Sequence, residues 1–221
     1  MLFDLRGRGR RRTVQGIYLG LAILIGGGLV LFGVGGAGIG LLNSSNNNGA
    51  GGGNPVAGQL KAAERAVRTH PNDPAAWAEL ARRRYQNADF NNATQKFTPQ
   101  GMQQLRAASA AWKHYLAMNP KNPDSDVAHL MTNAYAQDAL RQPADAVTAW
   151  EIVTQQDPTS ANYSQLAVEA YLAGQTRKGD LAANKAVELA PKPNQATLKA
   201  QLAQLKKQAQ SSAASGTSPG G

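Results

Sequence analysis

A long stretch without charge constrains this chain more than any other feature of its sequence. Residues 13–60 contain no charged side chain, and residues 17–42 are almost entirely apolar or glycine. An α-helix rises about 1.5 Å per residue, so residues 13–42 are long enough to cross the roughly 30 Å hydrocarbon core of a bilayer. The sequence therefore predicts a transmembrane helix over residues 13–42 and disfavours a fully soluble enzyme.

The charges beside the apolar segment predict its orientation. Residues 1–12 contain five arginines and one aspartate, and the next basic residue is Lys61. Basic residues accumulate on the cytoplasmic side of membrane proteins. We therefore expect residues 1–12 to be a basic cytoplasmic flank of a single-pass protein. The rest of the chain is then extracytoplasmic, in a cell envelope of the bacterial type.

A cleaved signal peptide is the alternative, because it has the same order of basic, apolar and polar regions. The apolar run exceeds the roughly 7 to 15 residues usual in a signal peptide, and only glycine-rich cleavage candidates follow Val34. These features favour an uncleaved signal anchor. Both alternatives place the following domain on the same side of the membrane.

The net charge of +9 says little about a ligand. About half of it belongs to the arginine-rich flank, and the rest is dispersed without the basic stripe and interleaved aromatics typical of nucleic-acid binding. Nucleic acid is therefore disfavoured as a partner. The chain has no cysteine, which excludes disulfides, zinc–cysteine sites and thiol catalysis.

Composition divides the remaining chain into three parts. Residues 43–58 are rich in Asn and Gly and predict a flexible linker. Residues 59–210 show helical periodicity and predict a repeat domain. Residues 211–221 form a Ser, Gly and Ala tail that we expect to be disordered.

Four prolines mark an internal repeat. Each follows a predicted helix, and the steps between Pro71, Pro120, Pro158 and Pro191 are 49, 38 and 33 residues. Proline lacks an N–H donor and disfavours helical geometry in the residue before it, so each one ends a helix. Repetition at this interval predicts a repeat architecture.

Each unit is predicted to be a pair of helices. The first helix of the first unit has one apolar face, and two later segments match it position by position. These matching positions are Trp77, Leu80, Ala81 and Tyr85; Val127, Leu130, Met131 and Tyr135; and Tyr163, Leu166, Ala167 and Tyr171. Small residues on the second helices, such as Ala108, Ala146 and Gly179, would let paired helices approach closely.

This pattern resembles the tetratricopeptide repeat (TPR) family, whose 34-residue helix-turn-helix unit carries W-x2-L-G-x2-Y, then A-x3-F, then a proline. The resemblance covers roughly residues 59–192 and departs from the family by Ala or Met in place of Gly and by a tyrosine displaced by one position. It implies an all-α solenoid of about eight helices without a sheet. About three units would follow a partial leading unit at residues 60–70 and precede a capping helix at residues 195–210.

The first unit is longer than the family's unit by about fifteen residues. Residues 87–98 are polar and rich in turn formers, and Thr98 followed by Pro99 predicts the start of a long helix that runs to Met118. Phe90 and Phe97 are unusual in such a loop. They either close over the end of the helix pair or form an exposed contact for a partner.

Few residues suit catalysis or metal binding. His70, His114 and His129 form no HxH or HxxxH pattern, and the glutamates fall singly on separate helices. No glycine-rich phosphate loop lies between a strand and a helix. We therefore predict no enzymatic activity, no metal and no cofactor.

The TPR resemblance implies a concave surface, built by the first helix of each unit, that binds other proteins or peptide segments. In this chain it would comprise Arg82, Tyr85, Gln86, His129, Thr132, Tyr135, Gln165, Val168 and Tyr171. Each tyrosine has the alternative of packing between helices with its hydroxyl at the rim. The predicted function is a scaffold or assembly factor for other proteins.

The N-terminal layout suggests a second function. The sequence LFDLRGRGRRR, followed by an apolar segment that ends in FGVGG, is similar to the anchors of bacterial periplasmic folding factors that sit near the translocon. This similarity covers about forty residues. An auxiliary envelope chaperone near the secretion translocon is therefore the alternative.

Overall fold

The computed structural model describes residues 55–216. The chain divides into two units, Met1–Gly51 and Gly52–Gly221, and the described residues belong to the second. The cytoplasmic flank, the transmembrane helix and most of the linker predicted from the sequence lie outside the described residues. Of the helices between residues 55 and 216, none is long and apolar enough to cross a membrane.

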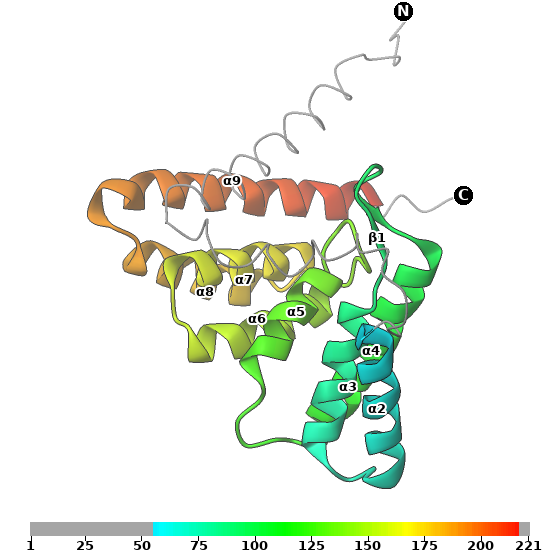
Figure 1. The fold of residues 1–221 in the computed structure, drawn as a ribbon. Coiled ribbons are helices and arrows are strands. Elements are labelled where there is room, and N and C mark those ends of the chain that lie inside the picture. The colour runs from blue at the N-terminus through cyan, green and yellow to red at the C-terminus, as the bar shows by residue number, and fades with distance from the viewer. Residues whose placement is uncertain (1–54, 217–221) are drawn as a thin grey trace, which may run out of the picture. The chain divides into compact units, whose positions relative to one another are not determined.

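The described part of the chain is mainly helical, as the sequence predicts (Figure 1). Its helices are α2 (Pro55–Thr69), α3 (Pro74–Gln86), α4 (Pro99–Ala117), α5 (Ser125–Ala134), α6 (Pro143–Gln156), α7 (Ser160–Leu172), α8 (Thr176–Leu189) and α9 (Lys192–Gly216). Most helices that follow one another in sequence also pack against one another, and α3 additionally contacts α5. The last helix, α9, lies along both α7 and α8.

Short polar caps start four of these helices. Each cap side chain accepts a hydrogen bond from a backbone N–H in the first turn, which satisfies a donor that the helix itself cannot pair. The caps are Asp73, Thr98, Asp124 and Thr159. Two of them precede a proline at the first helical position, where the missing N–H carries no cost. The predicted start of the long helix at Thr98 and Pro99 is confirmed.

The expectation of no sheet is wrong, because residues 87–98 contain a small hairpin. Strands β1 (Phe90–Asn91) and β2 (Lys96–Phe97) pair antiparallel, with Phe90 opposite Phe97. The Asn91 side chain accepts hydrogen bonds from the backbone N–H groups of Ala93 and Thr94, which closes the turn locally. A polar loop thus gains order from side-chain bonds that hydrophobic periodicity does not reveal.

The ends of the helical region also differ from their predicted positions. Helix α2 begins at Pro55, so the last residues of the predicted linker at 43–58 belong to a helix. Helix α9 runs from Lys192 to Gly216 and passes the predicted end at Gln210. It carries the predicted apolar stripe, with Leu202 buried and Leu198 and Leu205 packed against the core.

The buried residues form two clusters. The first cluster joins α2 to α6 and contains Trp112, Tyr135, Leu105 and Met131 among its largest buried side chains. The second cluster joins α6 to α9 around Leu202 and a set of alanines. The half-buried Trp150 of α6 packs against both clusters. Helix α6 therefore connects the two cores.

Candidate protein-binding surface

The structure sorts the nine candidate binding residues by how much of each side chain a partner could reach. Gln86 and His129 are exposed. The half-buried residues are Arg82, Tyr85, Gln165 and Val168. The buried residues are Thr132, Tyr135 and Tyr171.

Tyr135 and Tyr171 pack between helices. Tyr135 has no exposed surface, and its hydroxyl lies 3.1 Å from the hydroxyl of Ser109. Burial raises the pKa of Tyr135 to about 12. The Tyr171 hydroxyl donates a hydrogen bond to Asp180 at 3.0 Å, and burial raises its pKa as well. These two tyrosines join helices and do not offer an exposed contact.

Thr132, Tyr135 and Tyr171 are therefore buried, which for the two tyrosines is the alternative of packing between helices. Helical geometry gives the reason. Each comes four residues after a side chain with no exposed surface, namely Ala128, Met131 and Ala167. Residues four apart lie on the same face of a helix. These positions thus continue the buried stripe of their helices.

The remaining candidates outside α7 lie on α3 and α5, which pack against each other. Burial raises the pKa of the Tyr85 hydroxyl, and a hydrogen bond with the Asn133 side chain opposes part of that rise. Asn133 follows His129 by four residues on α5 and is exposed. We call Arg82, Tyr85, Gln86, His129 and Asn133 the α3–α5 group. Asn133 was not predicted, because its role depends on the approach of two helices that are far apart in sequence.

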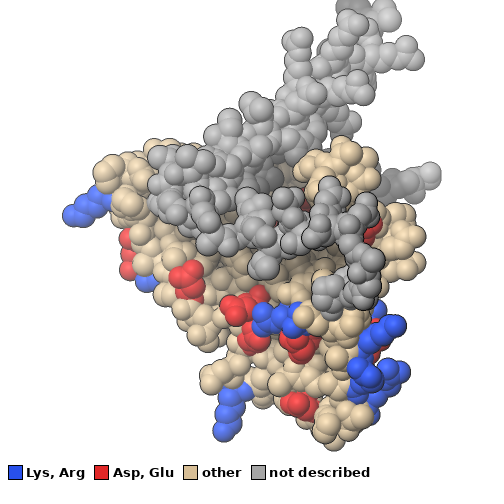
Figure 2. All heavy atoms as spheres, in the orientation of Figure 1, with Lys and Arg blue, Asp and Glu red and all other residues tan. Residues whose placement is uncertain are grey.

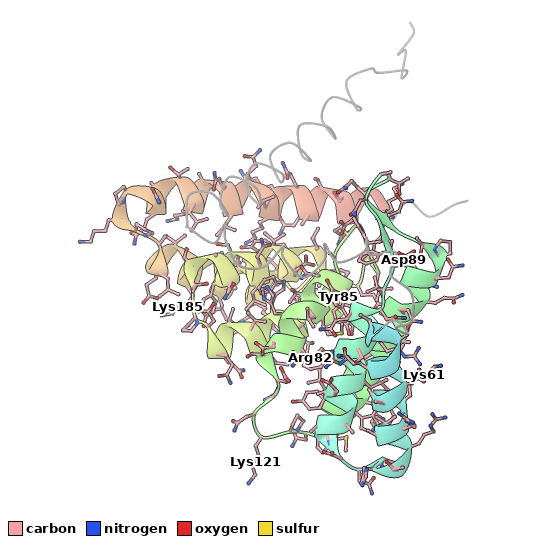
Figure 3. The ribbon with its side chains drawn as sticks, viewed as in Figure 1. Lys61, Arg82, Tyr85, Asp89, Lys121 and Lys185 are labelled. Atoms are coloured by element: carbon pink, nitrogen blue, oxygen red, sulfur yellow. The ribbon has the colours of Figure 1, made fainter. Side chains whose placement is uncertain are left out.

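Arg82 is held by carboxylates of the protein itself. Its guanidinium donates a hydrogen bond to Asp124 at 3.0 Å and lies 3.5 Å from Glu79. Figure 3 shows Arg82 and Tyr85 on the side of α3 that faces α5. Arg82 therefore ties the two helices together and positions the group. Gln86, His129 and Asn133 are its exposed members, and the Gln86 side chain also accepts a hydrogen bond from Arg83 at 2.9 Å.

Gln165 and Val168 lie apart from this group. Both are on α7, which packs against α6, α8 and α9, and Val168 contacts the second core cluster. Among residues 55–216, no hydrogen bond, ion pair or ring contact links either side chain to the α3–α5 group. The α3–α5 group therefore comprises residues of α3 and α5 only.

Two of the three histidines contact tryptophan rings, His114 in a tilted arrangement and His129 edge to face. The rings of Trp77 and His114 are 3.9 Å apart and join α3 to α4, and those of His129 and Trp150 are 5.8 Å apart and join α5 to α6. The Trp77 indole also donates to the Pro71 carbonyl at 2.8 Å. Within the described residues, no three His, Cys, Asp or Glu side chains gather closely enough to hold a metal ion.

The two phenylalanines of the hairpin differ, and each fits one of the two predicted alternatives, closing over the helix pair or forming an exposed contact. Their rings meet edge to face at 5.1 Å. Phe97 packs against the first core cluster, whereas Phe90 is 37% exposed. Phe97 thus closes over the helix pair, and Phe90 is the residue that a partner can reach.

Charge is less evenly dispersed than the composition suggests. Residues 55–118 carry nine basic and four acidic side chains, residues 119–191 carry five and nine, and residues 192–216 carry four lysines and no acid. Figure 2 shows Lys and Arg gathered at the lower right, over the region of α2 and α3. The basic residues of the repeat domain therefore concentrate at its two ends.

The comparisons with known proteins add no relative. The chain matches no protein-family model, and no curated protein is similar to it. The TPR resemblance of the repeats stays a prediction.

Proposed function

We propose that this protein is a membrane-anchored, extracytoplasmic scaffold or assembly factor that binds segments of other proteins on a TPR-like array of helix pairs. The observation that carries the proposal is the sequence of helix pairs, α3 with α4, α5 with α6 and α7 with α8, followed by α9 along the last pair. This order agrees with the repeats in the sequence. The apolar segment at residues 13–42 and its arginine flank support the anchor and its orientation.

The α3–α5 group supports a binding role for one part of this array. Tyr85 offers an aromatic ring with a polar tip, and Gln86, His129 and Asn133 offer exposed donors and acceptors. Such a surface suits an extended protein segment with exposed backbone amides and small apolar side chains. An acidic segment fits this surface less well, because Arg82 is already paired with Asp124.

A photo-crosslinking experiment in native membranes tests this function. A photoreactive residue at Gln86 should crosslink a small number of partners in stoichiometric amounts. The same residue at Gln201, an exposed position on α9, is the matched control and should not. The double variant His129→Ala and Asn133→Ala should abolish the Gln86 crosslinks while the circular dichroism spectrum is unchanged. Equal crosslinking from both positions would contradict the proposed surface.

An envelope chaperone is the second candidate. The exposed leucines of α7 and α8, in the region around the second core cluster, favour it. Leu172, Leu181 and Leu189 are 42%, 64% and 39% exposed. Exposed apolar side chains suit transient contact with unfolded clients. A chaperone would crosslink to many different secreted chains from Leu181, whereas a scaffold would crosslink to few partners from Gln86.

A further inference from the structure

Helix α2 has one face without a packing partner among the described residues. Its buried residues Leu60, Ala63 and Val67 face the first core cluster. Gln59 is exposed and accepts a hydrogen bond from Arg83 of α3. The other exposed residues lie on the opposite side at helical spacing and run along the helix; they are Gly58, Lys61, Ala62, Arg65, Arg68 and Thr69. The three basic residues form a stripe at i, i+4 and i+7 on this face, and Figure 3 marks its beginning at Lys61.

The basic stripe of α2 keeps its charge uncompensated. The one acid of the helix, Glu64, forms an ion pair with Arg84 of α3 at 2.7 Å. In the described part of the chain, Lys61, Arg65 and Arg68 have no carboxylate within ion-pair distance. The arginines of α3 differ, because each of them forms an ion pair with a glutamate or an aspartate; they are Arg82, Arg83 and Arg84. The stripe is therefore available to an external anionic surface.

The position of α2 in the chain indicates which surface that is. The predicted transmembrane helix ends at residue 42 and α2 begins at Pro55, so residues 43–54 connect them. Twelve residues span at most about 43 Å when fully extended, and about 17 to 21 Å as a flexible chain. Because the helix starts at Pro55, fewer residues separate it from the predicted anchor than the predicted linker at 43–58 contains.

We propose that the basic face of α2 binds the anionic lipid headgroups of the membrane that holds the anchor. This inference rests on the anchor in the proposed function, but not on the α3–α5 group. Cations near an anionic bilayer are attracted strongly enough that three of them raise the ratio of bound to unbound helix roughly a hundredfold at low salt. The bound helix would fix how the repeat domain is presented to its partners.

Two other anionic partners fit the stripe less well. Single-stranded nucleic acid is bound by basic residues with aromatic side chains between them, and the exposed face of α2 has none. The acidic middle region of a second copy is the other possibility. Several of its carboxylates already hold cations of their own chain, among them Asp124, Asp145 and Glu151. The headgroups of an anionic bilayer carry negative charges that are not already paired with cations of this chain.

Reconstitution of the full chain in vesicles tests the proposal, and the absence of cysteine makes single-site labelling simple. The variant Ala62→Cys places a fluorescent donor on the exposed face of α2, and a headgroup-labelled lipid is the acceptor. Vesicles of phosphatidylcholine alone are compared with vesicles that contain one quarter phosphatidylglycerol. Energy transfer should be greater with phosphatidylglycerol at 50 mM salt and should fall at 0.5 M salt, where the Debye length is about 4 Å.

A charge-matched pair of variants separates the stripe from net charge. Lys61→Gln, Arg65→Gln and Arg68→Gln together should remove the phosphatidylglycerol dependence. Lys192→Gln, Lys199→Gln and Lys207→Gln, which remove three exposed positive charges from α9, should leave it intact. Energy transfer that is the same with and without phosphatidylglycerol would overturn the proposal. An equal fall in energy transfer in both triple variants would overturn it as well. Transfer between labelled chains in place of transfer to lipid would also overturn it, in favour of a second copy.

Separate arms of the experiment report on the proposed function. Flotation of the chain with pure phosphatidylcholine vesicles at 0.5 M salt measures the anchor, since lipid charge does not contribute there. Crosslinking from Gln86 measures the scaffold. A chain that floats and crosslinks but shows no charge-dependent transfer would refute only the lipid contact of α2. A chain that does not float would refute the anchor on which the proposal rests.

Discussion

The two core clusters have the same helix-pair organisation but different side chains. The first cluster encloses Trp112 and Tyr135 with almost no exposed surface. The largest fully buried side chains of the second cluster are Leu202 and Val147, which lie among alanines such as Ala170 and Ala186. Buried apolar area is the main favourable term in folding, and large side chains bury more of it than alanines do, so we expect the second cluster to contribute less. Similar architecture therefore need not give similar local stability.

Not every buried polar atom of the described residues has a hydrogen-bond partner. In the first region, Tyr135 and Ser109 satisfy each other inside the core. In the second, the Glu169 carboxyl of α7 has a buried oxygen, Oε2, without a hydrogen-bond partner. A buried polar atom without a partner costs about 1 to 3 kcal/mol. Gln142 Oε1, at the start of α6, also has no partner, so the two regions differ in the side chains of their apolar cores more than in polar burial.

The largest expected effect is that of truncating the central side chain of each cluster. Trp112→Ala should reduce the free energy of unfolding by about 3 to 5 kcal/mol, and Leu202→Ala by about 2 to 4 kcal/mol, because each leaves a cavity in its core. Urea denaturation of the full chain followed by circular dichroism measures both. Hydrogen exchange should show that Leu202→Ala releases α9 while α3 and α4 stay protected. Loss of protection throughout in Leu202→Ala would mean that the two regions unfold as one.

Two helical glycines, one in each region, extend the comparison of packing. A Cβ at Gly101 of α4 would meet the backbone carbonyl of Asp89, and a Cβ at Gly179 of α8 would meet the ring of Tyr171. The hairpin backbone cannot rotate away as a side chain can, because Asp89 also accepts a hydrogen bond from Thr98. We expect Gly101→Ala to cost about 2 to 3 kcal/mol and Gly179→Ala about 1 to 2 kcal/mol by thermal denaturation.

Gly58 is the control for these glycine substitutions. It lies on the exposed face of α2, and a Cβ there would meet nothing within 4 Å. Gly58→Ala should stabilise the protein by about 0.5 to 1 kcal/mol, since alanine loses less conformational freedom in a helix. A cost at Gly58 similar to that at Gly101 would show that helix propensity is not the relevant difference and that α2 packs more closely than the structure shows.

The raised pKa of the Glu169 carboxyl on α7 predicts that the free energy of unfolding depends on pH. Burial raises the pKa of this carboxyl to about 7, from about 4.5 in the unfolded chain. The folded protein holds this proton over a range where the unfolded chain has lost it, so stability falls as the pH rises from about 4.5 to about 7 and is then constant. A shift of this size corresponds to about 3 kcal/mol at most, and partial exposure of the residue reduces it to about 2 kcal/mol.

The variant Glu169→Gln isolates this effect. It should raise the midpoint of thermal denaturation at pH 8 and remove the fall between pH 5 and pH 8. Glu188→Gln on α8 is the matched control, because Glu188 is exposed and its partner Lys185 is a surface residue at 3.1 Å. The same pH profile in wild type and Glu169→Gln would show that the carboxyl is solvated in the folded state.

The fold was predictable from the sequence where a side chain acts through its neighbours along one helix. The prolines, the caps at Asp73 and Thr98, and the apolar stripe of α9 are signals of this kind. The hairpin was missed because it depends on side-chain bonds from Asn91 within a polar loop. Local signals fix helix ends and faces well, and they say little about order in polar connections.

The candidate site was less predictable, because it depends on how helices approach one another. Tyr135 and Tyr171 occupy equivalent positions in the repeats and are both buried, although the pattern also allowed a surface role. Asn133 reaches Tyr85 only because α5 lies beside α3. The periodicity of a single helix gives the direction of a side chain but not which neighbour covers it. The α3–α5 group could therefore be recognised only from the packed structure.

The smallest expected effect concerns an ion pair that holds α9 to α8. Lys206 donates to both oxygens of Asp180 at 2.7 and 2.8 Å, and Tyr171 donates to the same carboxylate. The hydrogen bond from Lys206 is the main reason why the pKa of Asp180 is lowered. Because the Asp180 side chain is 43% exposed, solvent screening limits the contribution, and Lys206→Gln should cost less than about 1 kcal/mol.

A matched pair in the first region sharpens this last prediction. Lys113 of α4 meets Asp145 of α6 at 2.8 Å, also at the surface, but no third donor shares that carboxylate in the described residues. Thermal denaturation at pH 7 should therefore show a smaller cost for Lys113→Gln than for Lys206→Gln. A lowered pKa gives stability that is present above the unfolded value and lost as the pH falls through the folded one. The cost of Lys206→Gln should thus disappear in acid, whereas the cost of Leu202→Ala on the same helix should persist, since it comes from packing and not from charge.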